Sequence, residues 1–540
     1  MRTPSARDHI EKLFGKTTVF LEYVRPGFPL AKRLAEKFPA GPPADAIAIV
    51  MAKHGLAAWG ATAEECYSNL RSIIERADAY VADQSLRKTV FGTRVTPDLP
   101  EDERCDVAAR IAPVIRGELA SLGWRPILAF DEAPRTLEHV ASERFTDVCS
   151  RGVMTPEHIM RAGLRPLVIA MTEADAIRSA IRVAHDDYLG YAAANNQPTP
   201  IADWLKVIAV PGVGVFYAGK DRRNALIAGD CYRATMEAMA GAEAVERFES
   251  LSEADACEME YWPLERRKID ESAKSRRDLE GKIAVVVGGA SGIGAATAKR
   301  FAEGAAHVAV VDLDLGRAQA VADEINASTP ERALALAANA ADPSAIERAF
   351  REATVHFGGV DVLFYSPGVP PELYPVAEMP DAEVQTQLRV HYEGAVTATR
   401  VATQIMLAQG NGGRLIYNAS KAAFAPGEGA AAYGAAKAAL VHYVRNAANE
   451  LSRHGITANY INADAVDTPL FSALIRERSL QSGQTEDAIL GRYAERSIFR
   501  TATVAASAVA EAALWLASDR SAYTSGCVIT VGGGAEGMPR

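Results

Sequence analysis

The sequence has no long apolar run and no excess of positive charge. No stretch approaches the about 18 apolar residues of a membrane-spanning helix. The net charge of −10 and an isoelectric point near 5.6 argue against nucleic acid or an anionic membrane surface as a partner. The first residues, MRTPSARDHIEKLFG, are charged throughout and lack the apolar core of a secretion signal. We therefore expect a cytoplasmic protein that acts on a small molecule.

Paired cysteines and paired histidines are also missing. The six cysteines form no CxxC pair and stand at Cys66, Cys105, Cys149, Cys231, Cys257 and Cys527. Thiols so far apart indicate reduced cysteines in a cytoplasmic protein rather than a zinc knuckle or a disulfide framework. The sequence contains no HxH pair, and His139, His158 and His185 have no metal-ligand spacing between them. We expect no metal site.

Two charged segments divide the chain. At about 150 residues per domain, 540 residues correspond to three or four domains. The segment 86–104 is charged and contains prolines, and 266–281 is densely charged, so we predict a linker at each. The predicted domains are 1–85, 105–265 and 282–540.

A glycine-rich turn between two apolar segments opens the last domain. Residues 283–287 are all apolar, as in a strand buried on both faces of a parallel sheet; glycines, a helical pattern and a second apolar segment that ends at Asp312 follow. Glycine lets the backbone approach a pyrophosphate closely, and the N–H groups of a helix N-terminus bind anions. This order is the dinucleotide-binding pattern, in which the acid binds the adenosine ribose. The predicted contacts of the turn are Gly288, Ser291, Gly292, Ile293 and Gly294.

The acid at the end of the second apolar segment indicates which dinucleotide binds. The carboxylate of Asp312 accepts hydrogen bonds from ribose hydroxyls but repels a 2′-phosphate. We therefore predict NAD, rather than NADP, as the cofactor.

A tyrosine and a lysine four residues apart form the predicted catalytic pair. Tyr433 and Lys437 share one face of an alanine-rich helix, which puts the ammonium group beside the phenol. The positive charges of Lys437 and of an oxidised nicotinamide would stabilise the phenolate and lower the pKa of Tyr433. Tyr433 would then accept the proton of a substrate hydroxyl while the nicotinamide accepts the hydride. Ser420 would hold the substrate oxygen, and Lys437 would also bind the ribose hydroxyls.

With these residues in this order, 282–540 resembles the short-chain dehydrogenase/reductase superfamily. The TGxxxGIG motif of that superfamily corresponds to VGGASGIG at 287–294. The resemblance implies an α/β fold, with a Rossmann-type doubly wound parallel sheet that carries helices on both faces. It also implies cofactor contacts from Asn339, Gly368 and Thr468, in addition to Tyr433 and Lys437.

Several positions depart from the superfamily pattern. Val287 replaces a threonine, YSPG at 365–368 replaces NNAG, and Asn339 stands where an adenine-contacting aspartate is usual. His391 replaces the asparagine that supports a proton-relay water in the superfamily. Because an imidazole can also pass a proton, His391 is either a functional relay, and so a fourth catalytic residue, or a structural residue in a slower enzyme.

The rest of the chain resembles a bifunctional family. Segments 155–169, 258–269 and 462–466 (TPEHIMRAGLRPLVI, EMEYWPLERRKI and NADAV) are similar to parts of the rhamnulose-1-phosphate aldolase/alcohol dehydrogenase family, in which a class II aldolase precedes a short-chain dehydrogenase. In that family a histidine followed by glycine binds zinc, and here it would be His54. The other two ligands belong to an upstream HxH pair that this sequence lacks, and a catalytic zinc needs about three protein ligands. We therefore expect 1–85 to be a partial class II aldolase-like domain without the family's first segment, and 105–265 to be an α/β middle region.

Three functions fit these patterns. The first is an NAD-dependent oxidoreductase that assembles as a homo-oligomer and has an inactive aldolase-like half. The resemblance implies that its substrate is a small alcohol or a hydroxy-aldehyde such as lactaldehyde, and therefore a role in carbohydrate metabolism. The second is a bifunctional aldolase and dehydrogenase, against which the missing HxH pair argues. The third is an NAD-binding scaffold without turnover. The residues at 287, 365–367 and 391, which depart from the superfamily pattern, are the reason to consider it. The intact set of Ser420, Tyr433 and Lys437 favours the first.

Overall fold

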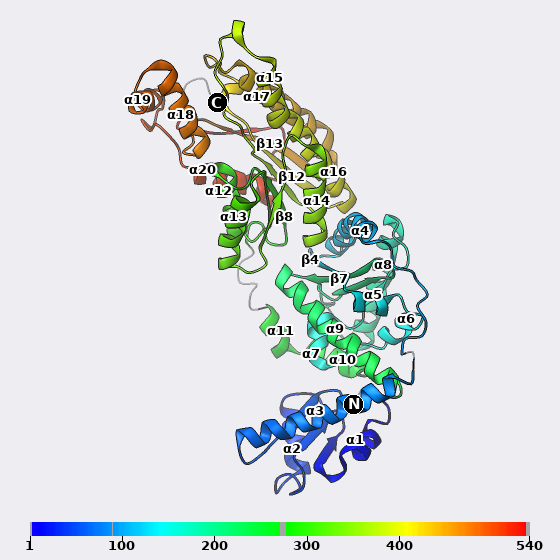
Figure 1. The fold of residues 1–540 in the computed structure, drawn as a ribbon. Helices are drawn as coiled ribbons and strands as arrows, with labels where there is room; N and C mark the ends of the chain where they lie inside the picture. The colour runs from blue at the N-terminus through cyan, green and yellow to red at the C-terminus, as the bar shows by residue number, and fades with distance from the viewer. Residues whose placement is uncertain (1–2, 89, 198, 271–276, 536–540) are drawn as a thin grey trace. The chain divides into compact units, whose positions relative to one another are not determined.

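The fold divides into two compact units. In a computed structural model, residues 3–88, 90–197, 199–270 and 277–535 are described (Figure 1). One unit comprises Met1–Val107, Ala129–Gly219 and Asn224–Lys274, and the other comprises Ala108–Leu128, Lys220–Arg223 and Ser275–Arg540. Residues 271–276 of the predicted linker lie outside the described part. Within that part, no helix has the length and apolar character needed to cross a membrane.

The first segment of the chain forms a small sheet with helices. Its elements are α1 (Ala6–Phe14), β1 (Thr18–Leu21), α2 (Phe28–Lys37), β2 (Ala48–Met51), β3 (Gly55–Ala58) and α3 (Ala63–Ser85). β2 pairs with β1 in parallel and with β3 antiparallel. The Thr62 hydroxyl caps α3 by accepting a hydrogen bond from the N–H of Glu65 at 3.1 Å. His54 lies in the turn of the β2–β3 hairpin, and its N–H donates to the Met51 carbonyl.

The middle of the chain contains a four-stranded sheet in the order β4-β7-β6-β5. Its strands are β4 (Ile127–Asp131), β5 (Leu167–Val168), β6 (Val207–Val210) and β7 (Gly214–Gly219). β6 and β7 pair antiparallel, and all of their residues are buried, which explains the apolar sequence there. The helices are α4 (Glu101–Ser121), α5 (Pro134–Val140), α6 (Phe145–Cys149), α7 (Pro156–Ala162), α8 (Ala174–Ala194), α9 (Arg222–Val245), α10 (Glu253–Glu260) and α11 (Pro263–Asp270). α4 begins inside the segment predicted as a linker.

The second unit is built on a seven-stranded sheet in the order β10-β9-β8-β11-β12-β13-β14. Every neighbouring pair in it is parallel, which confirms the predicted doubly wound sheet. The strands are β8 (Ile283–Val287), β9 (His307–Asp312), β10 (Ala333–Ala337), β11 (Val362–Tyr365), β12 (Gly413–Asn418), β13 (Ile456–Ala463) and β14 (Val528–Val531). The order reverses between β8 and β11, and ligands of such sheets bind at the carboxyl ends of the strands near that point.

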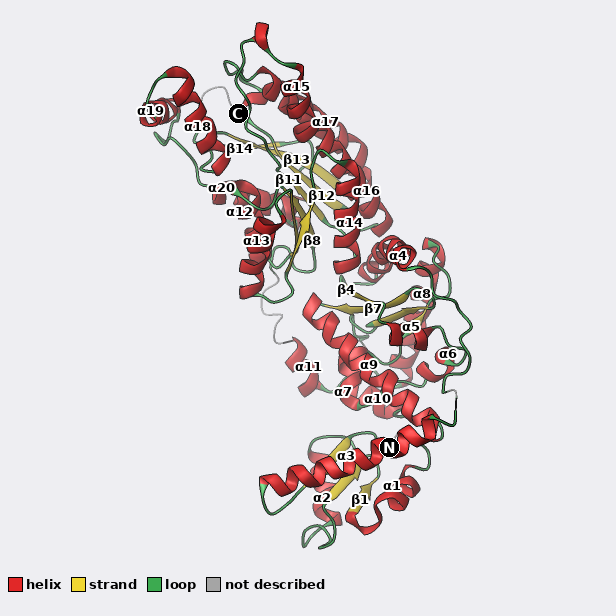
Figure 2. Cartoon of the chain, viewed as in Figure 1, coloured by secondary structure: helices red, strands yellow, loops and turns green. Residues whose placement is uncertain are grey.

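Helices cover both faces of this sheet (Figure 2). They are α12 (Gly292–Glu303), α13 (Leu315–Ser328), α14 (Pro343–Phe357), α15 (Asp381–Leu388), α16 (Gly394–Gln409), α17 (Ala431–Leu451), α18 (Pro469–Ser482), α19 (Glu486–Arg496) and α20 (Ala506–Ala517). Successive side chains of a strand point to opposite faces. Val285 and Val287 therefore pack with α14, α16 and α17, whereas Ala284 and Val286 pack with α12, α13 and α20.

A buried ion pair at the amino-terminal end of β11 ties α4 into the second unit. Arg116 of α4 is 0% exposed, and its guanidinium donates to both carboxylate oxygens of Asp361, at 3.0 and 2.7 Å. The same carboxylate accepts hydrogen bonds from the N–H of Ile283 and from the Gln409 amide, each at 2.8 Å. Burial opposes ionisation of Asp361, but the charge of Arg116 and these donors prevail and lower its pKa below the ordinary value.

Candidate active site

The predicted site residues gather at the carboxyl ends of the parallel strands. Each follows or ends a different strand: Gly288 after β8, Asp312 at the end of β9, Asn339 after β10, Gly368 after β11, Ser420 after β12 and Thr468 after β13. Because parallel strands end at one edge of the sheet, residues 180 positions apart in the sequence come together there.

The glycine turn between β8 and α12 leaves N–H groups available to an anion. α12 begins at Gly292, and Ser291 makes no side-chain capping bond to any described residue. Gly288 has a φ of +78°, which favours glycine. A Cβ atom on Gly294 would lie 1.8 Å from the Gly288 carbonyl oxygen, so only glycine lets the helix pack against the turn. This geometry fits a pyrophosphate at the helix N-terminus.

Asp312 is fixed beside that turn. One carboxylate oxygen accepts a hydrogen bond from the N–H of Ala290 at 3.0 Å, and the other accepts one from the N–H of Asp314 at 3.2 Å. The N–H donors hold the carboxylate next to the phosphate-binding backbone, where the predicted pattern needs an acceptor for ribose hydroxyls.

Two of the other predicted cofactor residues differ in how they are held. Thr468 caps α18, accepting a hydrogen bond from the Phe471 N–H at 3.2 Å, and its methyl carbon would be only 2.9 Å from a Cβ on Gly292. Thr468 therefore adjoins the glycine turn. Asn339 is exposed, and its side-chain oxygen accepts a hydrogen bond from the N–H of Ala341 at 2.9 Å.

Helix α17 places the predicted catalytic tyrosine and lysine as their four-residue spacing implies. Both are on α17, and the Lys437 Nζ atom lies 5.8 Å from the centre of the Tyr433 ring. Lys437 is 4% exposed, and its ammonium donates to the Asn418 carbonyl at 2.9 Å. The Ser420 hydroxyl adjoins the Tyr433 hydroxyl, where a hydrogen bond from it favours the phenolate. The structure therefore brings Ser420, Tyr433 and Lys437 together.

Burial dominates the proton affinities of this pair. It lowers the pKa of Lys437 to about 7. Burial also raises the pKa of Tyr433; the Ser420 hydrogen bond lowers it, and the negative charge of Asp464 raises it. The protein groups alone thus keep Tyr433 protonated near neutral pH. The lowering of the Tyr433 pKa expected from Lys437 is not among these influences; burial decides the direction of the shift, and the spacing of the two residues does not reveal burial.

His391 lies against Tyr433, the predicted catalytic tyrosine. It is 1% exposed, and its ring meets the Tyr433 ring edge to face, with 5.1 Å between centres. It belongs to a π-helical turn, Arg389–Glu393, a rare form that often marks functional sites. Neither ring nitrogen makes a hydrogen bond of good geometry to a described residue, but the backbone carbonyls of Val369 and Pro367 lie close enough to favour the protonated ring. Burial and the charge of Lys437 lower the pKa of His391 well below its ordinary value, so the ring is neutral near neutral pH.

The unusual Tyr365 supports this π-helical turn. Its hydroxyl donates to the Val390 carbonyl at 2.6 Å. A Cβ on Gly394 would lie 2.4 Å from the same hydroxyl, so the glycine leaves room for the larger side chain. The replacement of the usual asparagine by Tyr365 is therefore accommodated beside His391.

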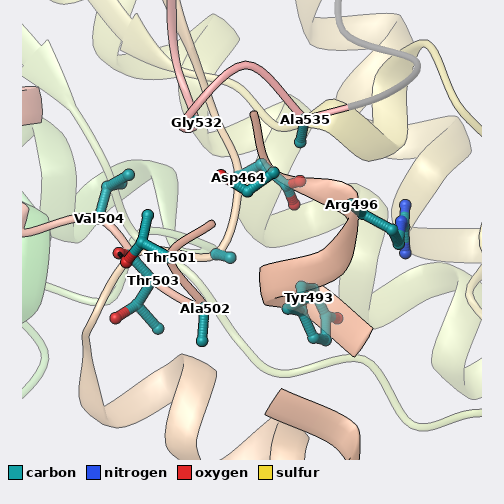
Figure 3. Close-up of a pocket in the computed structure, with 11 residues that line it drawn as sticks. Asp464, Tyr493, Arg496, Thr501, Ala502, Thr503, Val504, Gly532 and Ala535 are labelled. Carbon is teal, nitrogen blue, oxygen red and sulfur yellow. Dashed lines mark hydrogen bonds between the residues drawn. The ribbon is translucent and has the colours of Figure 1, made fainter. Parts of the chain in front are cut away.

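Three residues at the site were not predicted from sequence. Asn418 supplies the carbonyl that holds Lys437, and Lys421 and Asp464 form an ion pair with 3.3 Å between Nζ and Oδ2. Asp464 also lines a small hollow together with Tyr493 and Arg496 of α19, and Ser420, Tyr433 and Lys437 are not among the residues that line it (Figure 3). The one sequence signal was a charged residue at each position: a lysine directly after Ser420, and an aspartate within the segment 462–466.

Three known families match different parts of the chain. Residues 282–479 match the short chain dehydrogenase family. Residues 106–269 match the second domain of class II aldolases, and 2–81 match the class II aldolase and adducin N-terminal domain.

Individual relatives extend the comparison. An uncharacterized oxidoreductase of Bacillus subtilis, YuxG, is 33% identical over 538 residues, which are 97% of this chain and 77% of the relative. Momilactone A synthase of Oryza sativa subsp. japonica is 34% identical over 48% of this chain and 91% of its own length. The solved structure of sorbitol-6-phosphate 2-dehydrogenase SrlD from Erwinia amylovora is 29% identical, with a TM-score of 0.45, over 46% of this chain and 98% of that one. The chain thus belongs to the oxidoreductase family in which class II aldolase-type domains precede a short-chain dehydrogenase domain.

Proposed function

We propose that the chain is an NAD-dependent dehydrogenase that interconverts a small alcohol or hydroxy-aldehyde and its oxidised product. The observation that carries this is the convergence of Ser420, Tyr433 and Lys437 at the sheet edge that also holds the glycine turn and Asp312. A nicotinamide bound there supplies the hydride acceptor or donor.

The chain's own residues move and hold the proton. Tyr433 takes the proton of the substrate hydroxyl during oxidation and returns it during reduction. The Ser420 hydroxyl orients the substrate oxygen toward the phenol. Lys437, anchored by the Asn418 carbonyl, binds the ribose hydroxyls and favours the phenolate when it is protonated.

Cofactor preference is the first test of this proposal. In titrations, NADP should bind at least about tenfold more weakly than NAD, a difference of about 1.4 kcal/mol, because Asp312 repels a 2′-phosphate. Asp312→Ala should shrink the difference. Asp314→Ala is the matched control, since this exposed carboxylate two residues further on caps α13. Equal affinities of the unaltered protein for NAD and NADP would contradict the assignment of NAD. A separate screen of small aldehydes and polyols with NAD identifies the substrate.

We further propose that His391 takes part in proton transfer behind Tyr433. The His391 ring packs against the Tyr433 ring within a π-helical turn, and its nitrogens make no hydrogen bond of good geometry to the described residues, which leaves them able to exchange a proton. His391→Phe keeps an aromatic ring against Tyr433 but removes both nitrogens, so kcat should fall about 10²-fold. His391→Asn restores the usual superfamily residue and should keep most of the activity.

The pH profile distinguishes a relay from a titrating base. The pKa of His391 lies well below its ordinary value, so its ring does not titrate near neutral pH. The pH profiles of kcat for His391→Phe and His391→Asn should therefore neither gain nor lose an inflection there. This differs from the pH dependence expected of an ordinary histidine. Full activity in His391→Phe would show that the ring is only a packing element.

The aldolase-like half is proposed to have no lyase activity of its own. Within the described residues, no three His, Cys, Asp or Glu side chains come together as metal ligands, and His54 occupies a hairpin turn. A catalytic zinc needs about three such ligands. Elemental analysis of the purified chain should give no stoichiometric zinc; one zinc per chain that is lost in His54→Ala would overturn the proposal.

A further inference from the structure

Tyr365, the last residue of β11, is hydrogen-bonded to the backbone of the turn that carries His391. Its side chain is 2% exposed, and its hydroxyl donates to the Val390 carbonyl at 2.6 Å. Burial raises the pKa of Tyr365 above its ordinary value, so the phenol keeps its proton and acts as a donor. A buried carbonyl group needs such a donor, and here a side chain from a different element supplies it.

The π-helical form of the turn leaves this carbonyl to Tyr365. In an α-helix the N–H of Gly394 bonds to the carbonyl four residues back, which is that of Val390. In this turn it donates instead to the Arg389 carbonyl, five residues back. The Val390 carbonyl is therefore released from helix bonding and accepts the Tyr365 hydroxyl. The π-helical turn and the Tyr365 bond thus meet at one oxygen atom.

Gly394 lets the helix come close enough to β11 for this bond. A Cβ atom on Gly394 would collide with the Tyr365 hydroxyl and with the Ala340 carbonyl oxygen. Asparagine, the usual superfamily residue at position 365, has a much shorter side chain. From the same backbone position it would not reach the Val390 carbonyl, so the bond belongs to the tyrosine found in this chain.

His391 connects this bond with Tyr433. It directly follows Val390 in the chain, and its ring meets the Tyr433 ring edge to face with 5.1 Å between centres. The segment after Tyr365 flanks the other part of the ring, because a Cβ on Gly368 would lie 3.6 Å from the Cε1 atom of His391. One residue therefore separates the carbonyl that Tyr365 holds from the ring that packs on Tyr433.

We propose that Tyr365 is a positioning residue: its hydroxyl, bonded to the carbonyl that the π-helical turn leaves free, holds the His391 ring against Tyr433. The proposal rests on the proposed function, in which Tyr433 exchanges the substrate proton and His391 takes part in its transfer. It makes the departures from the superfamily pattern at 365 and 391 two parts of one arrangement. Without the hydroxyl, the Val390 carbonyl loses its donor, and a return to α-helical bonding moves the His391 ring away from Tyr433.

The test is a double-mutant cycle of Tyr365→Phe and His391→Phe. The quantity measured is kcat for alcohol oxidation with NAD and the substrate that the screen identifies. Tyr365→Phe alone should lower kcat about tenfold, less than His391→Phe does, because the imidazole is displaced rather than removed. In the His391→Phe background it should cause no further loss, since its effect passes through the imidazole.

Tyr417→Phe is the matched control. Tyr417 is the register partner of Tyr365 on the neighbouring strand β12, is also buried, and shares a hydrogen bond of 2.6 Å with the Thr399 hydroxyl of α16. Its loss should lower the melting temperature about as much as Tyr365→Phe does and leave kcat unchanged. A purely structural Tyr365 predicts the same loss of kcat with and without the His391 imidazole, or an equal loss in Tyr417→Phe; either result refutes the proposal.

A second variant breaks the same bond from the helix side. The methyl group of Gly394→Ala would displace the Tyr365 hydroxyl from the Val390 carbonyl. If Tyr365→Phe does not fold, a loss of kcat in Gly394→Ala that disappears in the His391→Phe background supports the proposal. Any other effect of Gly394→Ala on kcat then refutes it.

Hydrogen–deuterium exchange tests the turn without a substrate. Peptides that contain the turn Arg389–Glu393 should exchange faster in Tyr365→Phe than in the unaltered protein, and Tyr417→Phe should not change their exchange. Faster exchange with no turnover of any screened substrate would mean that the proposed function fails while Tyr365 still holds the turn. Turnover with unchanged exchange of these peptides in Tyr365→Phe would refute the positioning role alone.

Discussion

Tyr433→Phe is expected to lower kcat by about 10²–10⁴-fold, the usual contribution of a positioned proton donor or acceptor. The substitution removes one hydroxyl group and keeps the ring that packs against His391. The fold and NAD binding should therefore persist. Steady-state kinetics with the identified substrate give the loss, and a cofactor titration confirms that binding is retained.

Two variants on the same helix separate this effect from general damage. Tyr443→Phe removes a hydroxyl from another tyrosine of α17 that packs edge to face with Tyr392, and it should be almost neutral for kcat. Lys437→Met should reduce both turnover and cofactor affinity, because the ammonium serves the phenol and the ribose together. Full activity in Tyr433→Phe would refute the mechanism and favour an NAD-binding scaffold.

The fold of the second unit could be predicted from sequence because its signals are local. The buried strand at Ile283–Val287, the glycines after it and the acid at Asp312 lie within thirty residues of one another, and each follows from backbone sterics or burial. The predicted catalytic residues on α17, Tyr433 and Lys437, likewise share a helix face by spacing alone. The structure has the sheet order and the site edge that these patterns imply.

The charges around the site could not be predicted in the same way. Lys421 and Asp464 are separated by 43 residues, and their pairing depends on β12 and β13 being neighbours in the sheet. The neutrality of His391 and the raised pKa of Tyr433 depend on burial by elements far apart in sequence. A sequence shows that such residues are present, but their proton affinities follow only from what surrounds them.

The same limit applies to the extent of the second unit. The sequence predicts a boundary at the charged segment 266–281, but the compact unit also takes in Ala108–Leu128. The reason is the pairing of Arg116 with Asp361, which are 245 positions apart. A Cβ on Gly117 would lie 1.8 Å from the Gln409 carbonyl oxygen, so α4 and α16 approach closely at this glycine. No local sequence pattern around residue 116 predicts this contact.

Arg116→Met should therefore destabilise the second unit by about 3–5 kcal/mol, because it leaves the Asp361 carboxylate buried without its counter-charge. Arg116→Met with Asp361→Leu should be less destabilised than Arg116→Met alone, since the double variant removes the buried charge as well. Chemical denaturation, monitored by the unfolding of the second unit, gives the differences in free energy of unfolding between the variants. The control is Arg300→Met, whose partner Glu511 is 59% exposed; loss of such a surface pair costs about 0–1 kcal/mol.

The pH dependence gives an independent check on the same pair. The pKa of Asp361 is lowered in the folded chain, so its contribution to stability is present above the unfolded-state value of about 4 and is lost as the pH falls below it. In Arg116→Met the counter-charge is gone and burial raises the pKa of Asp361 instead. Acidification from neutral pH should then reduce the difference in free energy of unfolding between this variant and the unaltered protein, because protonation neutralises the unpaired carboxylate. If this difference in free energy of unfolding stays constant from neutral to acidic pH, Arg116 stabilises the unit by packing rather than by the attraction of its charge to Asp361.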